Sequence, residues 1–168
     1  MKKVFYAIPA LAILAACSSP TPPPKPERWI TVGVAPLDKV RYTVTFTVRD
    51  GAGKLVEQAK TDTTPGERFT IKSSHCRPYI KEIVEGKAIQ NTLCTGAFTS
   101  GRLSVLGDGK LEVEFEPLNY TELMNMRQMT TGGVTIDLPE VYDSSDGRFI
   151  LLTGNAGGEK SVGGGTVP

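Results

Sequence analysis

The sequence predicts a mainly β protein: a single antiparallel β-sandwich or meander-type domain with at most one short helix. The first observation is an alternation of apolar and polar residues with a period of two, clearest at 40–48, in segments rich in β-branched and aromatic residues. The second is that turn signals such as Asp50-Gly51 and Pro65-Gly66 separate these segments. Together they favour short strands joined by tight turns.

Strands are expected along most of the chain after the first 28 residues. They fall at 29–34, 40–48, 54–60, 68–72, 79–84, 103–106, 111–116, 134–139 and 148–152. The clearest hairpin joins 103–106 to 111–116 through an Asp108-Gly109 turn. The one helix candidate is 121–129, where Leu123, Met126 and Met129 recur at a spacing of three; an irregular loop is the alternative. The methionines are expected to fill the core rather than to bind a soft metal.

The N-terminus has the pattern of an export signal. Lys2 and Lys3 precede an apolar stretch at 4–14, which is too short for the roughly 20 apolar residues of a membrane span. Leu14-Ala15-Ala16-Cys17 then resembles the bacterial lipobox. The resemblance implies a signal peptide at 1–16, cleavage before Cys17 and attachment of lipid to that cysteine, with simple secretion as the alternative.

A proline-rich stretch follows, so that 17–28 is expected to be a lipidated cysteine with a spacer in the extended polyproline II conformation. A spacer is favoured over a PxxP ligand for a binding domain. Ser18, in place of the Asp that retains enterobacterial lipoproteins in the inner membrane, implies an outer-membrane anchor. The expected location is therefore the outer membrane, lipid-anchored, with the folded part facing the periplasm.

The mature chain is expected to hold one β-rich periplasmic domain at 29–153, followed by a flexible Gly-rich tail at 154–168. The formal net charge is +1, from 19 basic and 18 acidic residues. No basic block occurs in the mature part, so nucleic acid is not expected as a partner.

Three cysteines become an even pair once Cys17 is assigned to the lipid. Cys76 and Cys94 are then expected to form a disulfide, which suits an oxidising periplasm and contributes about 3 kcal/mol in the chain-entropy model. A metal site that uses the neighbouring His75 is the lesser alternative, because a tetrahedral zinc site would lack ligands. No metal is expected.

Motifs that mark catalysis or a cofactor are missing from the sequence: there is no GxSxG, HExxH or P-loop. Glu112, Glu114 and Glu116 share one face of a strand, and a solvated row is favoured over a glycosidase pair. We therefore expect no catalytic residues, no cofactor and no enzymatic activity.

Four short segments resemble the core of the bacterial secretin family, over roughly residues 60–154. They are 64–71, 101–105 with the Asp-Gly hairpin at 108–113, Leu138-Pro139-Glu140-Val141, and 146–154. In that family such motifs build an outer-membrane channel. The resemblance implies a small secretin-like or secretin-associated lipoprotein of a type IV pilus, secretion or conjugation apparatus.

Two functions from different classes follow from the sequence. The first is an accessory or structural component of an envelope assembly, held at the membrane by the lipid on Cys17 and pairing exposed strand edges with a protein partner. The second is a solitary β-domain that binds a small ligand, a glycan or a target protein.

Overall fold

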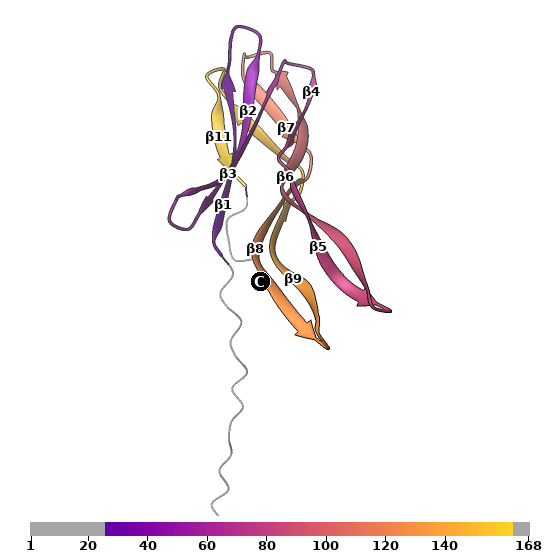
Figure 1. Cartoon of the computed structure of the whole chain (residues 1–168). Helices are drawn as coiled ribbons and strands as arrows, with labels where there is room; N and C mark the ends of the chain where they lie inside the picture. Colours follow the sequence, from indigo (N-terminus) through magenta and orange to yellow (C-terminus); the bar gives the residue numbers. More distant parts are fainter. Residues whose placement is uncertain (1–25, 163–168) are drawn as a thin grey trace, which may run out of the picture.

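The computed structural model describes residues 26–162, and every regular element in that range is a β-strand. The strands form two antiparallel sheets, which confirms the predicted fold class. Figure 1 shows the two sheets packed at one end of the molecule and two long hairpins projecting from the other end.

The first sheet has four strands in the order β11-β1-β2-β3. Its members are β1 (Arg28–Pro36), β2 (Tyr42–Asp50), β3 (Leu55–Thr63) and β11 (Gly158–Ser161). Alternate residues of β1 and β2 point inward, among them Ile30, Val32, Val44 and Phe46, all at most 1% exposed. This is the period-two pattern of the sequence expressed as one buried and one solvated face.

The second sheet has seven strands arranged around the 19-residue strand β6 (Lys87–Val105). The others are β4 (Arg68–Lys72), β5 (His75–Val84), β7 (Leu111–Phe115), β8 (Leu118–Thr131), β9 (Val134–Asp146) and β10 (Phe149–Thr153). On one side β6 pairs first with β5 and then with β4, and it also pairs with β7 and briefly with β8. The predicted hairpin of 103–106 with 111–116 is confirmed as the β6–β7 pair.

Only the half of the second sheet that lies away from the two projecting hairpins packs on the first sheet (Figure 1), and the core is confined to that half. Phe69, Leu103, Val113 and Phe115 of the second sheet are at most 3% exposed and belong to the same buried cluster as Phe46. Phe69 also packs edge-on against Phe115, with 5.5 Å between ring centroids.

The helix predicted at 121–129 is wrong, because these residues lie within β8 and pair with β9. A β-bulge between Leu123 and Asn125 explains the misleading pattern. The bulge inserts one residue into β8, so Leu123 opposite Val141 and Met126 opposite Pro139 fall on the same face of the ribbon. A spacing of three therefore arises here without a helix.

The segment predicted as a flexible tail begins with ordered structure as far as residue 162. Gly158–Ser161 forms β11 on the edge of β1, and Val162 is only 3% exposed in the core. The chain crosses from β10 to β11 through Gly157, whose φ of 88° suits glycine. A Cβ at that position would lie 2.1 Å from the carbonyl oxygen of Val34. Residues 163–168 lie outside the described range.

Candidate functional site

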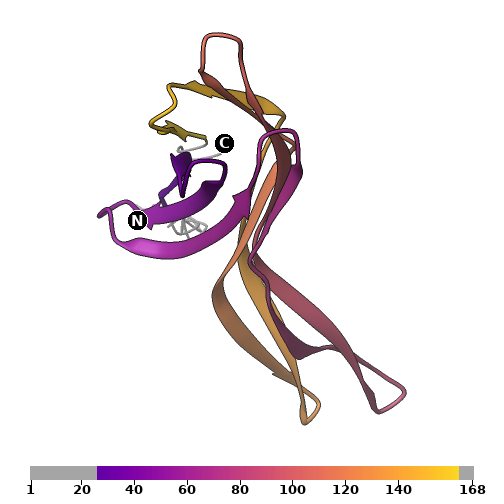
Figure 2. The same ribbon diagram turned by 90° about the horizontal axis from the view of Figure 1, so that it is seen from above.

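Two hairpins extend beyond the sandwich and carry no buried side chain, which is the most unusual feature of residues 26–162. We call residues 75–95 of β5 and β6 the first arm, and residues 122–141 of β8 and β9 the second arm. Both leave the same end of the sandwich in Figure 1, and the view from above in Figure 2 shows them side by side with separate tips.

The first arm is closed at its base by the predicted disulfide. Cys76 and Cys94 are direct cross-strand partners with their Cα atoms 4.0 Å apart. Residues 26–162 contain no group of three His, Cys, Asp or Glu placed to hold an ion, so His75 beside the two cysteines belongs to no such group. The disulfide therefore joins the two strands of the arm where it leaves the core.

An acidic side chain of the second arm forms a hydrogen bond with the first arm. The backbone N–H of Ile80 in the first arm donates to Oδ2 of Asp137 in the second arm at 3.0 Å, and Gln128 Nε2 donates to Oδ1 at 3.2 Å. These hydrogen bonds, the backbone one foremost, and the nearby charge of Arg77 hold the pKa of Asp137 below its usual range. The contact therefore favours the ionised carboxylate.

Proline blunts the edges of β5 and β9 that do not pair with β6 and β8. The Ile80 N–H points away from β6, toward the edge of β5 that does not pair with β6. Residues two apart in a strand direct their backbone nitrogens to the same edge, so the nitrogen of Pro78 also lies there. Proline has no N–H, and this edge therefore lacks a donor at Pro78. Pro139 stands opposite Met126, whose own N–H bonds to the Asn125 side chain instead of crossing to β9. The backbone nitrogen of Pro139 therefore lies on the edge of β9 that does not pair with β8.

The free edges of β6 and β8 are partly blocked by asparagine. Asn91 Oδ1 accepts the N–H of Thr92 in β6 at 2.8 Å, and Asn125 Oδ1 accepts the N–H of Met126 in β8 at 2.8 Å. Each strand of the arms thus has one device that weakens pairing with a further strand. Side-chain surfaces, more than strand edges, are left for binding.

At the base of the second arm, Arg28 at the start of β1 forms an ion pair with Glu122 of β8. Arg28 Nε and Nη2 donate to the two carboxylate oxygens at 2.6 and 2.9 Å, and Tyr120 Oη lies 3.1 Å from Oε2. The side chains of Arg28 and Glu122 are only 10% and 21% exposed. The hydrogen bond to Glu122 raises the pKa of Arg28, while burial and the Glu122 charge raise that of Tyr120.

Several large apolar side chains of the arms face solvent. Val84 and Ile89 in the first arm and Met124, Met129 and Leu138 in the second are all at least 40% exposed. The prediction that the methionines fill the core is therefore wrong for Met124 and Met129. Sequence reasoning missed this surface because exposed apolar residues on a two-sided ribbon leave no clear periodicity.

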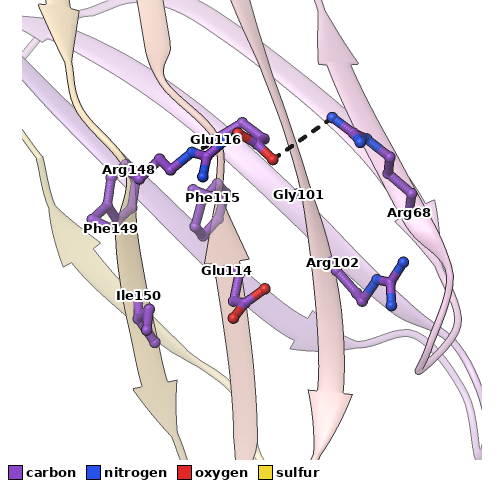
Figure 3. A pocket seen from close by; sticks show the side chains of 9 residues that line it. All are labelled: Arg68, Gly101, Arg102, Glu114, Phe115, Glu116, Arg148, Phe149 and Ile150. Atoms are coloured by element: carbon purple, nitrogen blue, oxygen red, sulfur yellow. Dashed lines mark ion pairs between the residues drawn. The ribbon is translucent and has the colours of Figure 1, made fainter.

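The outer face of the seven-stranded sheet, on the side away from the core, contains a hollow of about 420 Å³ (Figure 3). Arg68, Arg102 and Arg148 line it. Glu116, one of the three glutamates predicted to form a solvated row, lies between two of these arginines, 2.9 Å from Arg148 and 3.8 Å from Arg68. Arg102 makes no ion pair with any residue in the described range.

Next to this hollow the outer face carries exposed apolar side chains. Ile150, which lines the hollow, is 48% exposed, Leu152 two residues later in β10 is 61% exposed, and Phe98 of β6 is 47% exposed. No other element of residues 26–162 covers this face of β10, β7, β6 and β4. We use the name outer face below for Phe98, Ile150 and Leu152 together with the hollow.

Comparison with known families identifies residues 1–18 as a prokaryotic membrane lipoprotein lipid attachment site, so the chain is a membrane lipoprotein anchored through its lipidated cysteine. Cys17 itself lies outside the described residues. The secretin family gives no match, although the resembling segments 64–71, 101–113 and 146–154 do lie close together in the seven-stranded sheet. No curated protein and no solved structure matches the chain. Residues 26–162 contain no helix with the length and hydropathy to cross a membrane.

Proposed function

We propose that this lipoprotein is anchored in the outer membrane with its β-domain in the periplasm, where it acts as an accessory or structural component of an envelope assembly. The assembly would be a type IV pilus, secretion or conjugation apparatus, as the secretin resemblance suggests. The carrying observation is the outer face, a sheet surface on which large apolar side chains and arginines lie together. Arginine and aromatic residues are enriched in protein–protein interfaces, and arginine is among the residue types enriched in binding hot spots.

The partner suggested by this surface is a protein with both apolar and acidic groups. Ile150 and Leu152 would enter apolar contacts, and Arg102, which has no ion-pair partner in the described range, would meet a carboxylate. The prolines and asparagines on the arm edges argue against simple strand addition to the arms. We therefore propose that binding uses the outer face and not the exposed strand edges of the arms.

The test is a pull-down of the tagged lipoprotein from membranes in gentle detergent, followed by mass spectrometry. Components of a secretin, pilus or conjugation apparatus are expected to co-purify, and Ile150→Glu should remove them. Val40→Glu is the matched control, because Val40 is 64% exposed on a loop at the far end of the sandwich. Recovery of the wild-type protein alone, as a monomer, would contradict the proposal.

The Cys17→Ser variant separates the role of the anchor from that of the outer face. Without acylation the protein would no longer be concentrated beside membrane-embedded partners, so recovery should fall even with an intact outer face. Unchanged recovery from this variant would show that anchoring contributes nothing to the association.

A solitary binding domain is the second candidate, and the hollow is the observation that favours it. Glu114 and Glu116 also line this concave site, but Arg102 makes no ion pair in the described range. Its guanidinium suits a small anionic ligand, since guanidinium groups bind carboxylates and phosphates through paired hydrogen bonds. This function predicts that the wild-type protein is a monomer that binds such a ligand, and that the Arg102→Gln variant no longer binds it. Retention of the ligand by that variant would exclude the hollow as its site.

A further inference from the structure

We propose that the tip of the second arm rests in the headgroup region of the bilayer that holds the lipid anchor. The tip segment is residues 128–136, where β8 turns into β9. This inference depends on the lipid attachment site and on the geometry of the arms, and it is independent of the identity of any protein partner.

The described chain enters the domain at the base of the second arm. The described β-fold begins with β1 at Arg28, and the ion pair of Arg28 with Glu122 fixes this point at the base of the second arm. The loops at 37–41, 64–67 and 106–110 lie at the opposite end of the sandwich. The described chain thus begins at the end of the domain from which both arms project (Figure 1).

The second arm and the tether have similar lengths. The second arm runs through residues 122–131 of β8, which at about 3.3 Å per residue spans about 33 Å. The eleven residues 17–27 span about 34 Å when extended at about 3.1 Å per residue, the value for a proline-rich chain. A tether of this reach lets the arm tip and the acylated cysteine meet the same membrane surface.

The tip segment has side chains that suit the headgroup region. It contains no charged residue over nine consecutive positions, and Met129 is 47% exposed. Gly132 and Gly133 form a two-residue turn with φ of 61° and 78°, so the tip is narrow. Arg127 stands directly behind the tip and is paired with Glu140, on the solvent side of a shallow insertion.

The first arm has a different tip. Its turn at Glu85 and Gly86 is flanked by Lys81, Glu82 and Lys87, although Val84 is 49% exposed. Charged residues of both signs at this turn would have to remain among polar headgroups or in water. The uncharged tip segment of the second arm is therefore assigned a deeper position in the headgroup region than the tip of the first arm.

The experiment uses the full acylated lipoprotein reconstituted in vesicles of phosphatidylethanolamine and phosphatidylglycerol at a ratio of about three to one. An environment-sensitive fluorophore is attached to Met129→Cys, where the introduced thiol is free because Cys17 carries lipid and Cys76 and Cys94 are bonded to each other. The matched control carries the same label at Val40→Cys, at the far end of the sandwich. Thr131→Cys is a second tip position in case labelling at 129 disturbs the strand.

Quenching by spin-labelled lipid is expected for the labels at 129 and 131 and not at 40. Equal quenching at the tip and control positions, whether strong or absent, overturns the proposal. A second readout is vesicle co-sedimentation of the unacylated Cys17→Ser protein, in which Met129→Glu should weaken binding roughly tenfold. Identical partitioning of the two unacylated proteins would also overturn it. Because no protein partner is present, these results do not depend on the pull-down of the proposed function.

Discussion

The sandwich and the arms are built from the same kind of antiparallel strand but differ in what stabilises them. In the sandwich, alternate side chains from two sheets bury each other, as with Phe46 and Leu103, both 0% exposed. In the arms no side chain is buried, and the stabilising features are the cross-strand pairs, one disulfide and a few polar contacts. The sandwich is therefore stabilised by a buried core, while the arms expose their side chains and are stabilised only locally. The two regions are expected to differ in local stability.

The largest expected effect is on the sandwich. Phe46→Ala should lower the free energy of unfolding by about 3–5 kcal/mol, because a fully buried ring is lost and a cavity remains. Met129→Ala in the second arm should change it by less than about 0.5 kcal/mol, since Met129 is exposed. Urea denaturation followed by circular dichroism measures both. A large loss of stability in the Met129 variant would show that the arm is coupled to the core.

The disulfide gives the next effect, and it tests whether the first arm opens by itself. Replacing Cys76 and Cys94 by serine removes a cross-link between residues 18 apart in sequence, worth about 3 kcal/mol in the chain-entropy model. Because the arm has no core, we expect the lost stability to appear locally, as faster hydrogen exchange of the amides at 79–92. Amides of Val32 and Val44 in the sandwich serve as the internal control. Equal acceleration there would mean that arm and sandwich unfold as one unit.

The sequence predicted the sandwich much better than the arms, for a physical reason. Strands such as 40–48 have one buried face, so their apolar residues alternate and the pattern is readable. Both faces of the arms meet solvent, and this removes the constraint that produces alternation. Residues 87–95 of the first arm therefore show no strand signal, and the bulge at Met124 in the second arm imitates helical spacing at 121–129.

Other parts of the candidate site depend on contacts between residues far apart in sequence. The disulfide was predictable because only Cys76 and Cys94 remain to pair with each other once Cys17 is assigned to the lipid. Arg28 and Glu122 are 94 positions apart, and nothing in either neighbourhood identifies the other as its partner. β11 escaped prediction because its pairing with β1 uses backbone groups, which any sequence supplies.

The second arm has one ion pair at its base, against the sandwich, and another farther out in solvent, and the two are expected to differ in their contribution to stability. Glu122→Gln should lower the free energy of unfolding by about 2 kcal/mol, since it leaves the largely buried Arg28 without a charged partner. Glu140→Gln breaks the exposed pair with Arg127 and should cost less than about 1 kcal/mol. Thermal or urea unfolding of both variants measures the difference. Equal effects would contradict the distinction between the base of the arm and its free part.

The smallest effect concerns the contact between the two arms and depends on pH. The folded state depresses the pKa of Asp137, so its ionised form stabilises the contact fully above the ordinary carboxyl pKa near 4. That stabilisation should disappear as the pH falls through the depressed value, because the protonated acid accepts the Ile80 N–H more weakly. The amide chemical shift of Ile80, followed by NMR from neutral pH downward, should titrate with this carboxyl, and Asp137→Asn should abolish the transition. A transition that survives in Asp137→Asn would assign it to another group and leave the arms without a charge-dependent contact.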